Sequence, residues 1–321
     1  MMFFRQKIRH MTWAATAVLA VIATAAVAQD YPERDVTMIV QSSPGGGSDI
    51  IARTVAGIIQ QKGLLPTGLL VENRPGGGGA IAYNFIAQRK GDPYYLGIMA
   101  TSFFVAPLMG QSPAKISDFT PVSVIAADPF VLVVEANSTI QSLDDIREMG
   151  SVRIGNTGPV TDPALLAASL RDELGVQVRA VPFNGDGEVT TALLGGHIDL
   201  QFGNASEVMS QVEAGRVRPI AVTSSERLEA LPDTPTFKEL GSGIELMLYR
   251  GFMMSADVPP EAVAFWEDVL RQVSESPEWE EQYIRRNNSF PLYLDSEQFA
   301  AEIPNISARY ETYLREIQAI K

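Results

Sequence analysis

Two loops of the sequence carry the residue types that could bind an anion. The first, residues 42–49, reads Ser-Ser-Pro-Gly-Gly-Gly-Ser-Asp and connects a strand-like run, residues 36–40, to a helix-like run, residues 50–60. Glycine lets the backbone approach a ligand closely, and the free N–H groups at a helix N-terminus attract anions. Ser48 or Asp49 can cap this helix. The loop therefore predicts one half of a carboxylate-binding site.

The second loop, residues 156–162, has the same layout and reads Asn-Thr-Gly-Pro-Val-Thr-Asp. It follows a strand-like run, residues 152–155, and Pro163 then opens a helix with Asp162 as its expected cap. Ligands of open α/β sheets bind at the carboxyl ends of strands, so two such loops on facing lobes would share one cleft. Both loops could equally be ordinary turns, but three consecutive glycines exceed what a turn requires and favour binding.

The residue types needed for catalysis or metal binding are scarce. The chain has no cysteine, which removes thiolate nucleophiles, disulfides and zinc–thiolate sites. His197 is the only histidine after residue 28; its neighbours offer no nucleophile, and we interpret it as a surface residue. Residues 77–82 match a dinucleotide fingerprint only formally, because the next strand ends without the required acidic residue. We predict no enzyme activity, no cofactor and no metal. A calcium site of carboxylates stays open, without EF-hand spacing to support it.

Alternating strand-like and helix-like runs predict an α/β fold in both halves of the chain. The expected strands are residues 36–40, 69–72, 95–100, 152–155, 176–183, 198–202 and 219–222. The expected helices between them include residues 50–60, 80–89, 142–149, 186–194 and 206–214. In the helix at 80–89 we expect Ile81, Phe85 and Ile86 to face the core. Such alternation is typical of a mostly parallel sheet with helices on both faces.

The middle of the chain indicates two lobes joined by two crossings. Residues 122–126 and 130–135 are predicted as strands on either side of Asp128-Pro129, where the chain enters the second lobe, and residues 246–254 as the return. Two adjacent crossings are what a hinge requires. The predicted divisions are a signal peptide at 1–28, a discontinuous first lobe at 29–127 plus 250–321, and a second lobe at 128–249.

Two further features could belong either to the cleft or to the scaffold. Arg250, in the return crossing, could bind a ligand carboxylate in a bidentate manner or form a structural ion pair at the hinge, and we favour the ion pair. Phe103 and Phe104 could form an apolar wall of the cleft, but core packing is the better explanation.

The first 28 residues have the composition of a secretory signal peptide. Three basic residues precede an apolar, alanine-rich run, and residues 26–28 form a small-x-small cleavage site before Gln29. A retained membrane anchor is the alternative. The formal net charge of −13 makes nucleic acid or an anionic membrane an unsuitable partner. It also gives an anionic ligand no long-range attraction, so local donors must bind it.

Five segments together resemble one family of receptors. They are residues 31–34 (Tyr-Pro-Glu-Arg), 44–49 (Pro-Gly-Gly-Gly-Ser-Asp), 71–79 (Val-Glu-Asn-Arg-Pro-Gly-Gly-Gly-Gly), 192–199 (Ala-Leu-Leu-Gly-Gly-His-Ile-Asp) and 220–223 (Ile-Ala-Val-Thr). In order and spacing the chain resembles the periplasmic substrate-binding proteins of tripartite tricarboxylate transporters, the Bug receptors. The resemblance implies a two-lobed type II periplasmic-binding-protein fold that closes on a di- or tricarboxylate or a related carboxylate. It also implies a periplasmic monomer that delivers its ligand to a large and a small membrane subunit.

The resemblance also implies which residues hold the ligand. In these receptors the first strand–helix loop and its equivalent in the second lobe bind a carboxylate, partly through ordered waters, and strand ends line the cleft. Carried over position by position, the predicted ligand-binding residues are Ser43, Gly45, Gly46, Gly47, Ser48, Asp49, Thr101, Ser102, Gly155, Asn156, Thr157, Gly158, Thr161, Asp162 and Asn204. The chain departs from the family pattern at residues 41–43, at Pro159, which removes a backbone donor, and at residues 183–185, which lack a lysine. These departures leave the identity of the acid open.

Two alternatives to a transport receptor are compatible with the sequence. A receptor that feeds a sensor protein would show the same features. A secreted enzyme on the same scaffold would need a convergent acid, base or nucleophile. Only Asp49 and Asp162 qualify, and both are better explained as helix caps.

Overall fold

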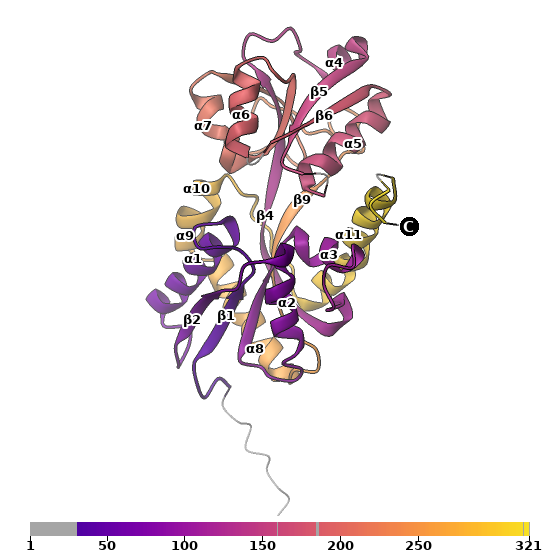
Figure 1. Cartoon of the computed structure of the whole chain (residues 1–321). Coiled ribbons are helices and arrows are strands. Elements are labelled where there is room, and N and C mark those ends of the chain that lie inside the picture. Colours follow the sequence, from indigo (N-terminus) through magenta and orange to yellow (C-terminus); the bar gives the residue numbers. More distant parts are fainter. Residues whose placement is uncertain (1–30, 159, 184–185, 317, 321) are drawn as a thin grey trace, which may run out of the picture.

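Two lobes stacked one above the other are joined by two long strands (Figure 1). The computed structural model describes residues 31–158, 160–183, 186–316 and 318–320, and the predicted signal peptide at 1–28 lies outside them. Each lobe consists of a sheet flanked by helices, so the predicted two-lobed α/β fold is confirmed. Within the described ranges, no helix combines the length and the apolar character that crossing a membrane requires.

The lower lobe is built on three parallel strands. β1 (Val36–Val40) lies between β2 (Leu69–Asn73) and β3 (Tyr95–Met99) and pairs in parallel with both. Four of the five β1 residues are buried, as expected for a parallel strand covered by helices on both faces. The helical segments between these strands and the next are α1 (Gly47–Lys62), η1 (Gly77–Gly79), α2 (Ala80–Ala87), α3 (Thr101–Leu108) and η2 (Ile116–Asp118).

The helices of the lower lobe pack through apolar faces, one of which differs from prediction. In α1, Ile51, Val55 and Ile58 are spaced by four and three residues and are fully buried on one face. In α2 the expected inward residue Ile81 is 53% exposed, whereas Tyr83 of the same helix is buried. The α2 sequence is apolar almost all round, so its hydropathy pattern does not fix which side faces the sheet.

No helix is predicted at residues 101–108, yet α3 forms there. The segment is uniformly apolar after its first two residues and contains Pro107, and both features hide the helical period. Phe103 and Phe104 are buried in the core of the lower lobe, which confirms the packing role favoured for them. The new helix places Thr101 and Ser102 in its first turn rather than at a strand end.

The upper lobe repeats the plan with a second set of parallel strands. β5 (Ser151–Asn156) pairs in parallel with β6 (Gln177–Pro182) and β7 (Leu200–Asn204). The remaining strand is β8 (Val217–Val222). The helices are α4 (Leu143–Met149), α5 (Asp162–Leu174), α6 (Asp186–Leu194) and α7 (Ala205–Glu213). Because α5, α6 and α7 each follow the carboxyl end of a strand, their N-termini lie at the same edge of the sheet.

The lobes are connected by β4 (Phe119–Glu135) and β9 (Met247–Ser255), which run antiparallel. β4 is continuous, so the break expected at Asp128-Pro129 is wrong. β4 pairs with β9 up to Pro129 and with β7 and β8 from Phe130 and Val131 onwards. Proline removes a ladder donor, and here it stands where the strand changes partner. The strand therefore passes from one sheet to the other without leaving the extended conformation.

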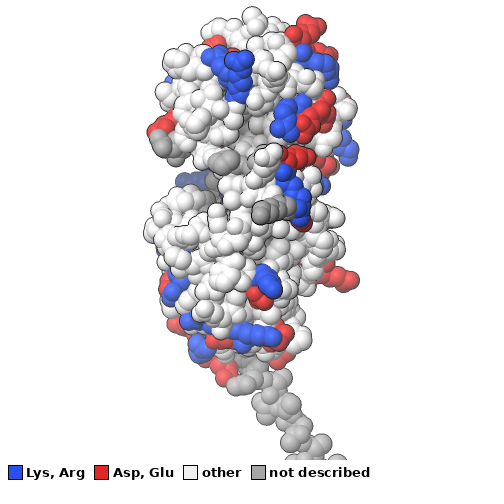
Figure 2. Space-filling model, turned by 45° about the vertical axis from the view of Figure 1, so that its right-hand side comes forward, with Lys and Arg blue, Asp and Glu red and all other residues white. Residues whose placement is uncertain are grey.

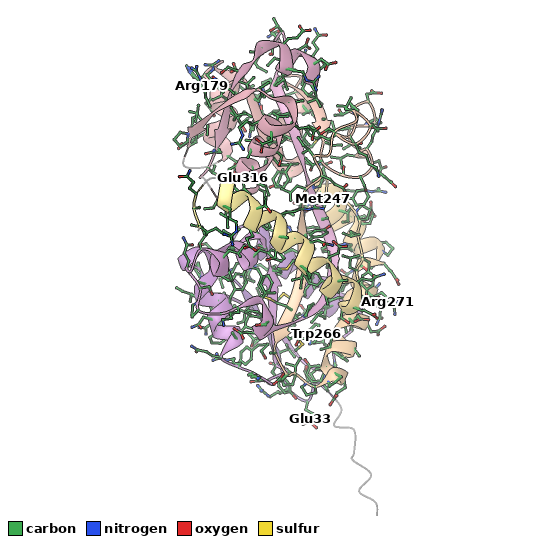
Figure 3. All side chains as sticks on the ribbon, turned by 90° about the vertical axis from the view of Figure 1, so that its right-hand side faces the viewer. Glu33, Arg179, Met247, Trp266, Arg271 and Glu316 are labelled. Carbon is green, nitrogen blue, oxygen red and sulfur yellow. The ribbon has the colours of Figure 1, made fainter. Side chains whose placement is uncertain are left out.

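The chain then returns to the lower lobe and ends in helices. These are α8 (Pro260–Ser274), α9 (Pro277–Trp279), the π-helical turn η3 (Glu280–Ile284), α10 (Arg285–Asn287) and α11 (Ser296–Glu316). Figure 3 shows α11 crossing the lower lobe and ending with Glu316 beside the upper lobe. There the Glu316 carboxylate lies 3.8 Å from a guanidinium nitrogen of Arg171 in α5. α11 therefore contacts both lobes.

Candidate ligand-binding site

A cavity of about 340 Å³ lies between the two lobes. The surface is hollowed at the waist of the molecule in the space-filling view (Figure 2). The lower lobe contributes Gly78, Thr101, Ser102, Val105, Ala106 and Gln111. The upper lobe contributes Phe130, Thr157, Val160, Thr161, Asp162, Pro163, Asp186, Asn204 and Glu207. A small molecule in this cavity would touch both lobes at once.

Three helices begin at the cavity without a side-chain cap. Their N-cap residues are Ala100 for α3, Thr161 for α5 and Asn204 for α7, and none of these side chains accepts a hydrogen bond from its helix. The first N–H groups of a helix have no partner within the helix and carry a partial positive charge. Three such helix ends around one cavity form a place where backbone donors favour an anion.

Asp162 joins the two lobes instead of capping α5 as predicted. Thr161 is the N-cap, and Asp162 is the first residue of the helix. The buried Asp162 carboxylate accepts a hydrogen bond from Thr101 Oγ1 at 2.5 Å and another from the hydroxyl of Tyr310 in α11. Burial raises the pKa of Asp162, although both hydrogen bonds act to lower it. The side chain is thus engaged in holding the lobes together.

The side chains of the first loop serve the loop itself. The N-cap of α1 is Gly46, so the capping role predicted for Ser48 or Asp49 is wrong. The Asp49 carboxylate accepts hydrogen bonds from the Gly45 N–H at 2.8 Å, Asn73 Nδ2 at 2.9 Å and Arg53 Nε at 3.0 Å. Burial acts to raise the pKa of Asp49, but these hydrogen bonds outweigh it and the pKa is lowered.

Arg250 forms the ion pair at the crossing strands that we favoured. Its Nε donates to Asp128 Oδ2 at 2.6 Å, and Ser289 Oγ donates to Asp128 Oδ1 at 2.6 Å. The pair ties β9 to β4 where the lobes meet. A Cβ atom on Gly47 would lie 3.1 Å from Arg250 Nη2, so glycine lets the first loop lie against the guanidinium group. Arg250 is also close enough for its charge to act on Asp162.

The structure brings part of the predicted set to the cavity. Thr101, Ser102, Thr157, Thr161, Asp162 and Asn204 line it. The predicted residues that do not line it are Ser43, Gly45, Gly46, Gly47, Ser48, Asp49, Gly155, Asn156 and Gly158. Among these, Gly155 faces the packed side of β5, where a Cβ atom would lie 2.5 Å from Val189 Cγ1. Contact between any of these residues and a ligand stays a prediction.

Two acidic residues of the cavity wall were not predicted. Asp186 is the first residue of α6, and Glu207 lies in the first turn of α7. Glu207 lines the cavity, and although the residue is exposed, the surrounding protein partly desolvates its carboxylate. This desolvation, followed by the negative charge of Asp186, raises the pKa of Glu207 to about 7. The sequence signal that could have indicated them is an acidic residue shortly after each strand. This signal is ambiguous, because the helix dipole also favours acidic residues at a helix N-terminus that binds no ligand.

Asn204 supplies an unused donor beside these carboxylates. Its Nδ2 atom is buried and has no hydrogen-bond partner within the described structure. A buried polar group without a partner costs about 1–3 kcal/mol. Because Asn204 lines the cavity, a rotation of its side chain towards a ligand acceptor would remove that cost.

Known proteins share both the sequence and the architecture. The profile of the family described as "Tripartite tricarboxylate transporter family receptor" matches residues 51–319. Protein BugT of Bordetella pertussis is 32% identical over 246 residues, which cover 72% of this chain and 75% of BugT. A TctC solute-binding protein from Polaromonas, solved without ligand, superimposes with a TM-score of 0.80 at 28% identity. The match covers 89% of this chain and 99% of that one.

A further solved relative contains a bound organic acid. It is an R. palustris protein with adipate, 25% identical, with a TM-score of 0.73 and coverage of 89% of this chain and 98% of that one. The fold and the cavity between the lobes define a periplasmic solute-binding protein. The family match is more specific: the chain belongs to the tripartite tricarboxylate transporter receptor family, as its resemblance to the Bug receptors predicted.

Proposed function

We propose that this protein captures a small organic acid in the cavity between its lobes and delivers it to the membrane subunits of a tripartite transporter. One observation carries the proposal: α3, α5 and α7, all without side-chain caps, begin at a single cavity that both lobes line. The R. palustris relative solved with adipate supports a carboxylate as the ligand. Carboxylate oxygens would accept hydrogen bonds from the free N–H groups at these helix starts and from the hydroxyls of Ser102 and Thr157. The hydroxyls of Thr101 and Thr161 already donate to Asp162 and to the Gly158 carbonyl.

Backbone and hydroxyl donors can supply the affinity without a cationic side chain. A hydrogen bond to a charged group contributes roughly 1.5–3 kcal/mol, and a helix N-terminus contributes about 0.3–1 kcal/mol. The summed free energy of a few such contacts, after subtraction of the cost of association, is about −8 kcal/mol. This binding free energy corresponds to micromolar affinity. The proposed site therefore tolerates the absence of lysine and arginine from the described cavity wall.

The two crossing strands provide the hinge for closure. We place lobe 1 at residues 29–127 plus 250–321 and lobe 2 at residues 128–249. The change of β4 partners between Pro129 and Phe130 supports this division. Across the cleft, the hydrogen bonds from Thr101 and Tyr310 to Asp162 favour the closed arrangement, and a ligand held between the lobes would add further contacts.

The cellular setting follows from the family. The family description names a receptor of a tripartite transporter, which supports delivery to a large and a small membrane subunit. We further propose that residues 1–28 direct export, and that the mature protein acts in the periplasm as a monomer.

A calorimetric screen with a matched pair of variants tests the proposal. Mono-, di- and tricarboxylates are titrated into the protein, with sugars and metal cations as unrelated ligands. Asn204→Ala removes an unused donor from the cavity without removing a cap, because the Asn204 side chain does not cap α7. We expect it to weaken acid binding about tenfold, the equivalent of one hydrogen bond. Asn305→Ala, on an exposed position of α11, should bind as the wild type does. If no carboxylate binds while a sugar or a metal cation does, the proposal is overturned.

A further inference from the structure

The cavity wall carries more negative charge than a simple organic acid requires. Among the described residues that line it, Asp162, Asp186 and Glu207 are acidic and none is lysine, arginine or histidine. Asp162 is occupied by the hydrogen bonds from Thr101 and Tyr310. Asp186 and Glu207 are therefore the two carboxylates that a ligand would meet.

These two carboxylates line the same cavity from neighbouring helices of the upper lobe. They come from the first turns of α6 and α7, which pack against each other, and the charge of Asp186 acts directly on Glu207. Arg250 and Asp128 are the other charged groups that act on Glu207. Arg250 is already paired with Asp128, so among the described residues no cation forms an ion pair with Asp186 or Glu207 at the cavity wall.

Hydrogen-bond donors line the same cavity as the carboxylates of Asp186 and Glu207. Asn204 is the N-cap of α7, and its Nδ2 is buried without a partner among the described residues. The uncapped starts of α3 and α5 add backbone donors on other sides of the same cavity. A ligand that matched this wall would offer acceptor oxygens to the helix starts and donor hydrogens to Asp186 and Glu207.

We infer that the ligand is an amino acid, an organic acid with an ammonium group next to a carboxylate, and that Asp186 and Glu207 bind the ammonium group. This inference rests on the function proposed above. An ammonium group has three donors, and its hydrogen bonds to carboxylates are charge-assisted. A dicarboxylate that placed its second carboxylate at the same position would meet two like charges, and such a juxtaposition selects against it.

The sign of the pH dependence separates the two ligand classes. A bound ammonium group favours ionised Glu207, so binding releases a proton and affinity rises from about pH 6 to about pH 8. A dicarboxylate with a carboxylate near Glu207 would favour the protonated form, and its affinity would fall over the same range. Glu207 can report this because its pKa is about 7.

Isothermal titration with matched acids tests the inference. The pairs are succinate with aspartate, glutarate with glutamate, and adipate with 2-aminoadipate, each at about pH 6 and pH 8. In at least one pair we expect the amino acid to bind about tenfold or more tightly than its partner, with affinity rising with pH. Glu207→Gln and Asp186→Asn should each remove most of that preference. Glu213→Gln, the same charge change at the exposed far end of α7, should not alter it.

The outcomes distinguish the two proposals. If dicarboxylates bind and their amino analogues bind more weakly, the amino-acid inference is overturned and the carboxylate receptor stands. If amino acids are preferred but the preference survives in both Glu207→Gln and Asp186→Asn, the role of these residues is wrong. If neither acid of any pair binds but another carboxylate of the calorimetric screen does, the inference is overturned and the carboxylate receptor stands. If no carboxylate of the screen binds, the proposed function fails together with the inference.

Discussion

Asp162 connects the cavity to the contact between the lobes. Its carboxylate lines the cavity and accepts hydrogen bonds from Thr101 and Tyr310 of the lower lobe. Hydrogen bonds to charged groups contribute more than neutral ones, and leaving a buried acceptor without its donor has a large cost. The residue is therefore the first place where a small change should affect the association of the lobes.

Removal of the Tyr310 hydroxyl should destabilise the protein. Tyr310→Phe keeps the buried ring but deletes one donor to Asp162, and we expect the free energy of unfolding to fall by about 1–3 kcal/mol. Urea denaturation measures this change. Tyr249→Phe is a suitable control, because its ring packs against the same core cluster and it does not contact Asp162. Equal losses in the two variants would argue against a special role for the Tyr310–Asp162 bond.

The raised pKa of Asp162 predicts how stability changes with pH. The folded protein holds the Asp162 proton more tightly than the unfolded chain does. The contribution of Asp162 to stability is therefore fully present at a pH below the pKa of an ordinary aspartate, about 3.9. It is lost as the pH rises through the raised pKa that Asp162 has in the folded protein. Asp162→Asn does not titrate, so the stability of the wild type relative to this variant should fall with rising pH. A relative stability that increased with pH would contradict this reading.

Gly47 and Gly57 offer a matched test of the contact between the first loop and Arg250. A Cβ atom at position 47 would lie 3.1 Å from Arg250 Nη2, whereas one at position 57 meets nothing within 4 Å. Both residues belong to α1. Gly47→Ala should cost about 1–3 kcal/mol because the added methyl group overpacks against the guanidinium that is paired with Asp128. Gly57→Ala should instead stabilise the helix by about 0.5–1 kcal/mol. Thermal unfolding of both variants checks the pair, and stabilisation by Gly47→Ala would show that Arg250 can move freely.

Sequence spacing placed one of the two predicted loops, residues 156–162, at the cavity, but it did not predict the roles of the loop side chains. Thr157, Thr161 and Asp162 follow a strand and do reach the cavity. Asp49 also follows a strand, but its carboxylate is used by Asn73, a residue 24 positions away. Such long-range hydrogen bonds leave no local pattern in the sequence, so a loop can be recognised while the roles of its side chains are not.

At the scale of elements, the start of α7 is the clearest backbone donor to test. Ala205 is the first residue of α7, and Asn204 before it has φ −57° and ψ 145°, a conformation that a following proline favours. Ala205→Pro should keep the helix but remove one N–H group, weakening acid binding about tenfold. Ala205→Val adds similar bulk to this buried site and keeps the N–H group. Calorimetry in which both variants bound equally well would remove this backbone donor from the site.

Strand and helix alternation could be predicted because its signals are local. Strands β1 and β5 and helix α6 lie where the apolar runs and turn residues predicted them. The continuity of β4 could not be predicted, because Asp128-Pro129 reads as a break and only the pairing with β9 keeps the strand extended. The helix α3 was missed because its apolar residues are set by the surrounding core rather than by a helical period.

At the scale of the whole molecule, the charge is spread without a field that would attract an anion. The formal net charge is −13, and Lys and Arg lie beside Asp and Glu on the face shown in Figure 2. The described cavity wall has no basic side chain. Any attraction for an organic acid must therefore come from short-range contacts inside the cavity, which salt screens weakly.

Binding should consequently depend little on ionic strength. Between about 0.05 and 0.5 M salt we expect the dissociation constant of the preferred acid to change by less than about threefold. Calorimetric titration at several salt concentrations provides the measurement. A steep loss of affinity with salt would indicate capture by exposed basic side chains instead of by helix N-termini.

A crystal structure of the protein with its tightest-binding acid tests the central claim most directly. The account predicts the acid in the cavity between the lobes, with carboxylate oxygens within about 3.2 Å of backbone nitrogens in the first turns of α3, α5 or α7. An acid bound outside this cavity, or held mainly by lysine or arginine side chains, would contradict it.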